Sequence, residues 1–126
     1  MDAPLKNQRK SPRIDFSIQE QFPGEASTAD RTAPSIPVVL LSMSEGGISF
    51  QCDEVMSGNL SEGLVLAIRM GKPCPIFFLD GALCEVRYVL HNREGGQATI
   101  GCRFRKLRGT AEEEIKKFLS FRLEKK

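Results

Sequence analysis

Residues 38–52 read VVLLSMSEGGISFQC, a stretch in which two apolar segments are separated by a short polar turn. The first segment, residues 38–41, is wholly apolar, and the second begins at Ile48. Apolar segments of this length on either side of a glycine-containing turn are typical of two adjacent strands. The stretch therefore predicts a pair of strands joined around Gly46 and Gly47.

Further short strands are predicted on both sides of this pair. Ile14, Phe16 and Ile18 alternate with polar residues, which places them on one face of a strand. The other predicted strands cover residues 63–70, 76–79, 83–90 and 98–104. A hairpin turn is predicted at residues 91–96. Residues 23–37 contain three prolines, and we predict a long irregular connection there instead of a strand.

The end of the chain has a different pattern. Thr110 can cap backbone amides at the start of a helix. Ile115, Phe118 and Leu119 follow as an apolar stripe at helical spacing. We predict a helix at about 110–124 that packs on the open end of the strands; the alternative is a helix that binds a partner.

The predicted fold class is all-β, a small six-stranded antiparallel β-barrel with a C-terminal α-helix. Closing the sheet into a barrel removes the exposed edges that an open sheet would present. We predict a basic N-terminal arm over residues 1–12 and one domain over 13–126, with the barrel at about 13–108. A chain of 126 residues is long enough for one hydrophobic core.

Composition excludes several classes of protein. No apolar segment reaches the roughly 20 residues that span a bilayer, so we expect no membrane insertion. We expect no secretion signal, because no hydrophobic segment lies near the N-terminus. Cys52, Cys74, Cys84 and Cys102 form no C-x-x-C pair. We expect reduced core cysteines in a cytoplasmic protein; a disulfide between strand neighbours is the alternative. No nucleophile motif or Walker loop occurs and His91 stands alone, so we expect neither an enzyme nor a metal site.

Positive charge is concentrated near the N-terminus, although the net charge is only +2. Arg9, Lys10 and Arg13 lie close together, and an arginine fork of donors matches both a phosphate and the edge of guanine. In residues 44–47, glycines can adopt positive φ and let a ligand approach the backbone. These features predict a site for a compact anionic ligand; the alternatives are a solvated basic tail and a plain hairpin turn.

Three segments resemble one known family. Residues 9–13, RKSPR, match an R-x-x-x-R pattern ahead of the first strand. Residues 42–47, SMSEGG, match a [D/N]-x-S-x-x-G pattern between two strands, except at Ser42. Residues 100–104, IGCRF, are similar to the family's last strand. From about Gln8 onward the chain resembles the PilZ domains, bacterial receptors for cyclic diguanylate (c-di-GMP), which implies a six-stranded barrel with a C-terminal helix.

The resemblance also implies a ligand site. Its members are Arg9, Lys10, Arg13, Ser42, Ser44, Gly46, Gly47 and Tyr88. The arginines are implied to bind phosphate and guanine edges, Lys10 to add positive charge, Ser44 to contact the ligand and Gly47 to keep space free. Tyr88 is a candidate for stacking on guanine, with a plain outward-facing tyrosine as the alternative. Ser42 stands where the family has Asp or Asn; the neutral hydroxyl forfeits roughly 1 to 2 kcal/mol, so we expect retained but weaker binding.

The implied function is a c-di-GMP receptor or adaptor of bacterial second-messenger signalling, in motility or biofilm formation. The arginine arm would close over the nucleotide and change binding to an unidentified downstream protein. No cofactor and no nucleic-acid polymer are expected, and we expect a monomer or a weak dimer.

Two alternatives belong to other classes of protein. The first is a PilZ adaptor that does not bind nucleotide and acts by protein–protein contact, for example in motility or type IV pilus assembly. Ser42 favours this alternative, whereas Arg9 and Arg13 oppose it. The second is a small barrel for single-stranded nucleic acid, but one tyrosine and no tryptophan provide few side chains for stacking on bases.

Overall fold

The computed structural model describes residues 13–17, 19–20, 22–30, 34–71, 74–92 and 94–124. In these ranges, seven strands, two short 3₁₀ helices and one α-helix follow one another along the chain. They are β1 (Ile14–Asp15), β2 (Phe22–Thr28), β3 (Ile36–Met43), β4 (Gly47–Asp53), η1 (Met56–Asn59), β5 (Val65–Met70), η2 (Phe77–Leu79), β6 (Leu83–Asn92), β7 (Gln97–Lys106) and α2 (Ala111–Glu124).

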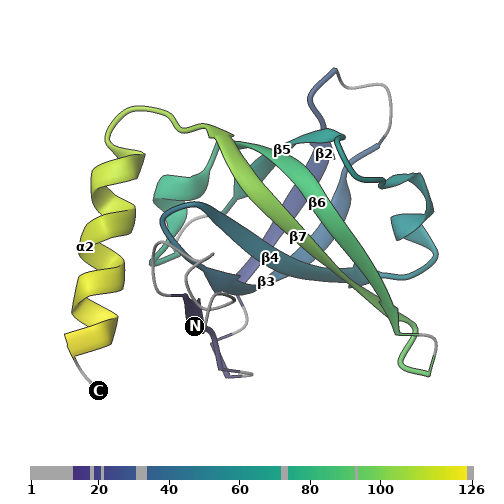
Figure 1. The fold of residues 1–126 in the computed structure, drawn as a ribbon, viewed down its shortest axis with the longest axis horizontal. Helices are drawn as coiled ribbons and strands as arrows, with labels where there is room; N and C mark the ends of the chain where they lie inside the picture. Colours follow the sequence, from purple (N-terminus) through teal and green to yellow (C-terminus); the bar gives the residue numbers. More distant parts are fainter. Residues whose placement is uncertain are drawn as a thin grey trace, which may run out of the picture.

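Six of these strands close into an antiparallel barrel (Figure 1). Around the barrel the order is β2, β3, β4, β7, β6 and β5, and the pairing of β5 with β2 closes the ring. The short strand β1 lies outside this ring. It pairs with Met43 and Ser42 at the end of β3, beyond the part of β3 that pairs with β2. The predicted all-β barrel with a C-terminal helix is confirmed.

The core fills the barrel because alternate residues of each strand point inward. The largest fully buried side chains on the strands are Leu40, Met43, Phe50, Leu66, Ile68, Val86 and Ile100. The helix α2 flanks the barrel and contributes Ile115 and Leu119 to this core. Phe118 lies with its ring centroid 6.2 Å from Phe16 and 6.1 Å from Phe78. The predicted packing of the helix on the β-structure is confirmed: its apolar stripe contacts the core beside β1 and η2.

The connection predicted at residues 23–37 is wrong at both ends, because residues 23–28 belong to β2 and residues 36–37 belong to β3. In β2, Phe22, Ala26 and Thr28 are buried at intervals of four and two residues, which is the pattern of one inward face. Pro23 is the second residue of the strand, a position near a strand start where the missing N–H is tolerated. The inward residues include a small alanine and a polar threonine, and the strand contains a proline, so apolar content alone does not identify this strand.

Two further predicted strands differ from the structure. Residues 77–79 form η2, and the buried residues Ile76 and Leu79 are three apart, which is the repeat of a 3₁₀ helix. The strand predicted from Ile14 to Ile18 is regular only over β1. Phe16 N–H still donates to the carbonyl of Leu41 at 2.8 Å, and Ile18 lies outside the described residues.

Candidate functional site

A hollow of about 560 Å³ lies on the outer surface of β3, β4, β7 and β6. Its walls come from four places in the sequence that only the barrel brings together. They are Arg13, the segment of β3 and β4 around the 44–47 turn, the bulge of β6 and the middle of β7. The lining residues are Arg13, Ser42, Ser44, Gly46, Gly47, Ile48, Ser49, Arg87, Tyr88, Gly101, Cys102 and Arg103.

The turn between β3 and β4 forms one wall of the hollow. Ser44 N–H donates to the carbonyl of Gly47 at 2.9 Å, and the hydroxyl of Ser44 accepts from Gly46 N–H at 3.2 Å. Gly46 and Gly47 do not use the positive φ that glycine can adopt; the glycines with positive φ in the described part are Gly63, Gly81, Gly96 and Gly109. Gly47 has a different role: an ideally placed Cβ there would lie 2.0 Å from the carbonyl oxygen of Cys102. Close contact between strands, and not turn conformation, therefore requires glycine.

Two serine hydroxyls meet on the floor of the hollow. Ser42 and Ser49 face each other on β3 and β4, with 2.5 Å between their Oγ atoms. Both residues are more than nine-tenths buried. A buried hydroxyl needs a partner, and each serine supplies one for the other. The hydroxyl at position 42, where an acidic or amide side chain would be expected, is thus already engaged within the protein.

A β-bulge places Arg87 and Tyr88 at the rim. The register between β6 and β7 shifts between Val86 and Tyr88, so that Arg87 is an extra residue in β6. Bulges commonly redirect a side chain beside a functional site. Tyr88 then lies opposite Gly101, and a Cβ on Gly101 would lie 2.1 Å from Cε2 of the tyrosine. The ring rests on the glycine backbone and stays 40% exposed, which leaves a face available for stacking.

Three arginines surround the hollow. Arg13 Nε lies 3.3 Å from Asp15 Oδ1, and Arg103 Nη2 donates to Glu85 Oε1 at 2.9 Å. Arg87 makes no ion pair with any other residue in the described part of the chain. The rim is therefore positively charged.

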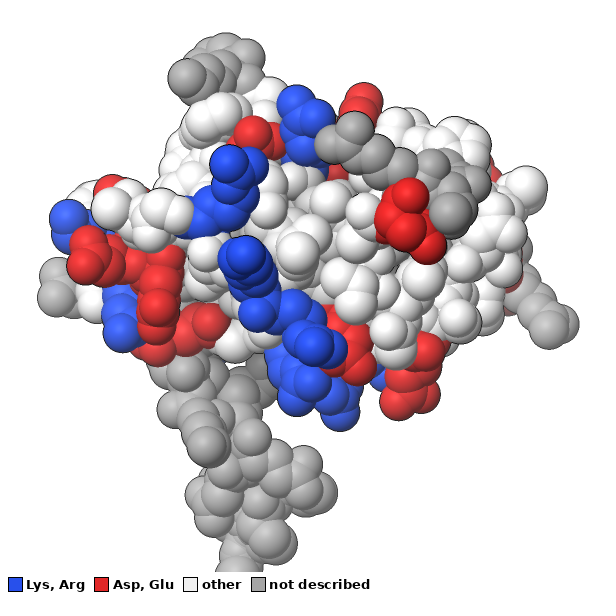
Figure 2. Space-filling model, turned by 90° about the horizontal axis from the view of Figure 1, so that it is seen from above, with Lys and Arg blue, Asp and Glu red and all other residues white. Residues whose placement is uncertain are grey.

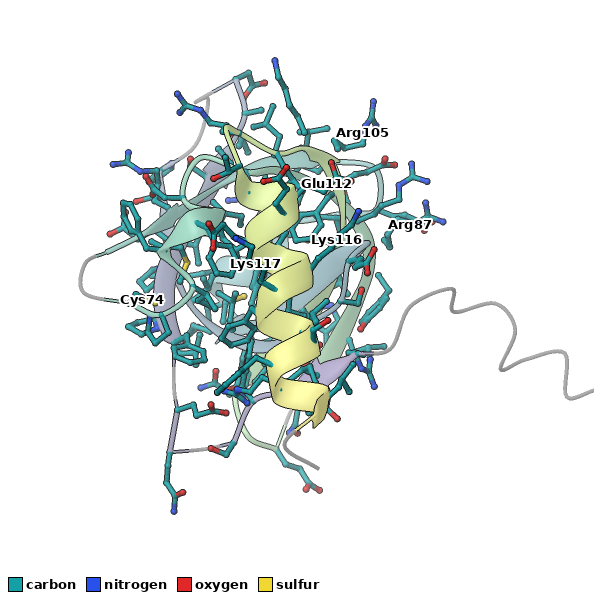
Figure 3. All side chains as sticks on the ribbon, turned by 90° about the vertical axis from the view of Figure 1, so that its left-hand side faces the viewer. Cys74, Arg87, Arg105, Glu112, Lys116 and Lys117 are labelled. Carbon is teal, nitrogen blue, oxygen red and sulfur yellow. The ribbon has the colours of Figure 1, made fainter. Side chains whose placement is uncertain are left out.

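A carboxylate on the outer face of β6 holds two of the arginines on β7. Glu85 Oε1 accepts from Arg105 Nη1 and from Arg103 Nη2, each at 2.9 Å. The hydrogen bonds from Arg105 and then Arg103 lower the pKa of Glu85, so this group remains charged at neutral pH. Figure 2 shows Lys and Arg side chains in a band across the face seen from above. In Figure 3, Arg87 and Arg105 project outward on the same side of the molecule.

Six of the eight predicted site residues line the hollow: Arg13, Ser42, Ser44, Gly46, Gly47 and Tyr88. The other two, Arg9 and Lys10, lie outside the described residues. Sequence reasoning missed Ser49, Arg87, Gly101 and Arg103. Of these only Gly101 carried a signal, because glycine inside a strand often marks a close approach.

Among the described residues that line the hollow, Cys102 is the one cysteine, and none is His, Asp or Glu. Burial raises the pKa of Cys102 to about 12, so its thiol stays protonated at neutral pH. The four cysteines are unbonded. Within the described ranges, no cluster of His, Cys, Asp or Glu could hold a metal ion, and no helix has the length and apolar character to cross a membrane. The arrangement suits binding of an anion with a flat ring.

The family model of the PilZ domain matches residues 7–121. A search of curated proteins found no match. Among solved structures, the PilZ domain of YcgR from Escherichia coli, with c-di-GMP, is 16% identical with a TM-score of 0.66, covering 94% of this chain and 92% of that one.

Two further solved structures contain the same fold as part of a longer protein. The Bacillus subtilis inhibitor of motility, MotI/DgrA, is 13% identical with a TM-score of 0.66, covering 94% of this chain and 52% of that one. The MrkH–c-di-GMP complex of K. pneumonia is 14% identical with a TM-score of 0.69, covering 93% of this chain and 53% of that one. The chain thus spans about half the length of these two proteins, and at such identity the likeness shows a common fold.

Proposed function

The chain belongs to the PilZ domain family, and we propose that it is a receptor for c-di-GMP which binds the dinucleotide in the hollow on β3, β4, β6 and β7. One observation carries this proposal. Arg13, the 44–47 turn and Tyr88, which come from distant parts of the sequence, line the same hollow of about 560 Å³. The proposed activity is binding, with c-di-GMP as ligand and not as cofactor.

Each part of the hollow suits one part of the ligand. Arg13, Arg87 and Arg103 present planar forks of donors to phosphate oxygens or to the O6 and N7 edge of guanine. Tyr88 offers an exposed aromatic face to a guanine ring. Gly47 lets β4 approach the backbone of β7 closely, and Gly101 lets the Tyr88 ring rest on β7, so these two glycines shape the hollow.

Signal output is proposed to begin at the N-terminal arm. Arg13 now pairs with Asp15, and a bound phosphate would compete for the same guanidinium. Arg9 and Lys10 precede it in the sequence and would add charge as residues 1–12 close over the ligand. The rearranged surface would then change the binding of a downstream protein in the cytoplasm, in motility or biofilm control. MotI, which shares this fold, is named as an inhibitor of motility.

The paired hydroxyls of Ser42 and Ser49 favour a second candidate function. A neutral hydroxyl that is already bonded accepts from guanine less well than a carboxylate would. An adaptor that acts by protein contact alone is consistent with this feature. The three arginines on the rim favour the receptor.

Isothermal titration of the full chain with c-di-GMP separates the two candidates. The receptor predicts a dissociation constant in the submicromolar to low-micromolar range. Cyclic diadenylate, which keeps the phosphates but lacks the guanine edges, is the matched control and should bind more weakly. Absence of heat with c-di-GMP at millimolar concentration would contradict the receptor and support the adaptor.

A further inference from the structure

The second half of β6 has an edge that no strand covers in the described part of the chain. β5 pairs with β6 only at Leu83, Cys84 and Glu85. The last backbone hydrogen bonds on this side of β6 are at Val86, whose carbonyl accepts from Gly63 N–H and whose N–H donates to the carbonyl of Leu64. From Arg87 to Asn92, β6 pairs with β7 alone. Figure 1 shows the β6–β7 hairpin extending away from the barrel at the end opposite α2.

Beyond the bulge at Arg87, this edge lacks the features that normally prevent strands from associating. Residues 88–92 read YVLHN and contain no proline, lysine or acidic residue. The bulge at Arg87 lies at the start of the edge, and Tyr88 to Asn92 follow in regular register with β7. Leu90 is 58% exposed and Tyr88 is 40% exposed. An open strand edge with exposed apolar side chains is a template for an added strand.

We propose that this edge binds the same edge of a second copy of the chain, in an antiparallel pair related by a two-fold axis. With Val89 opposite its own counterpart, Tyr88 of each copy lies opposite Leu90 of the other. Aromatic and aliphatic side chains in such cross-strand positions stabilise each other. No two charged side chains face each other within residues 88–90 in this register. A two-fold pair needs only one kind of edge, and this segment supplies both members of each contact.

The small size of the contact sets its strength. A few residues of paired strand bury much less than the roughly 1,000 Å² of a stable interface. The pair should therefore be transient, with a dissociation constant on the order of 0.1 to 1 mM. The contact forms without the proposed ligand, although it shares Tyr88 with the hollow.

Sedimentation equilibrium of the full chain between about 0.01 and 1 mM tests the proposal. The average mass should rise from that of the monomer toward twice that value. Leu90→Lys should raise the dissociation constant about tenfold or more, because it removes both Tyr88–Leu90 contacts. Since Leu90 is largely exposed, the variant should keep its fold, which its circular dichroism and melting temperature verify.

Gln51→Lys is the matched control. Gln51 lies opposite Thr99, which lies opposite Leu90, so the same charge is placed on the same face two strands away from the edge. This variant should associate like the parent. A monomer throughout the concentration range would overturn the proposal and leave the edge to a strand from another protein. A dimer weakened by Gln51→Lys but not by Leu90→Lys would overturn it as well.

Discussion

Gly47→Ala is expected to destabilise the fold by about 1 to 3 kcal/mol or more and to weaken ligand binding at the same time. The added Cβ would lie 2.0 Å from the carbonyl oxygen of Cys102 and 3.1 Å from Cα of Arg103. Both atoms belong to the backbone of β7, so a change of side-chain rotamer cannot relieve the overlap. β4 and β7 would have to separate where they form the floor of the hollow.

The neighbouring Gly46 provides a close control. A Cβ at that position comes no nearer than 4.0 Å to Ser44 Oγ, which is an ordinary contact. Thermal unfolding of both variants measures the difference, since a change of 1 kcal/mol moves the melting temperature of a domain this size by roughly 3 to 6 °C. Equal melting temperatures for Gly46→Ala and Gly47→Ala would refute the steric role of Gly47.

Arg103→Ala is expected to weaken c-di-GMP binding by about 10- to 100-fold, whereas Arg105→Ala should change it by less than about threefold. A hydrogen bond between charged groups contributes roughly 1.5 to 3 kcal/mol, which corresponds to this range of affinity. Only Arg103 lines the hollow. Arg105, two residues further along β7, is not among the residues that line it.

The two arginines are otherwise well matched. Their side chains are 54% and 53% exposed, and each donates to Glu85 Oε1 at 2.9 Å. Each substitution removes one positive charge and one partner of Glu85. Titration calorimetry of both variants therefore isolates direct contact from general electrostatic attraction. Equal losses of affinity would mean that the ligand senses only the net charge of this face and does not contact Arg103.

The central part of the fold could be predicted from sequence because its pattern is local. The two apolar segments of residues 38–52 and the turn between them indicate β3 and β4 without reference to the rest of the chain. β2 was missed because its inward face is made of Phe22, Ala26 and Thr28, and apolar content alone does not identify that pattern. η2 was missed because a short apolar run fits a strand as well as a 3₁₀ turn.

Some residues of the candidate site could likewise be predicted from local sequence, and others could not. Arg13 and the 44–47 turn occur in short motifs, so the sequence was sufficient to find them. Arg87 belongs to no motif, and the segment 100–104 that contains Arg103 indicates only a strand. A bulge directs Arg87 to the rim, and strand register places Arg103 beside it. The engagement of Ser42 by Ser49 likewise depends on the pairing of β3 with β4. Contacts made by register between strands are not visible in any one segment.

The central claim is that c-di-GMP binds in the hollow on β3, β4, β6 and β7, and NMR titration of the ¹⁵N-labelled chain tests it most directly. Binding there predicts shifts of the backbone amides of residues 42–49, 87–88 and 101–103 as the dinucleotide is added. Amides of Glu25, Ser27, Ala67 and Arg69, which line a different surface on β2 and β5, should stay unchanged. Shifts confined to those residues, or no shifts with c-di-GMP in excess, would contradict the claim.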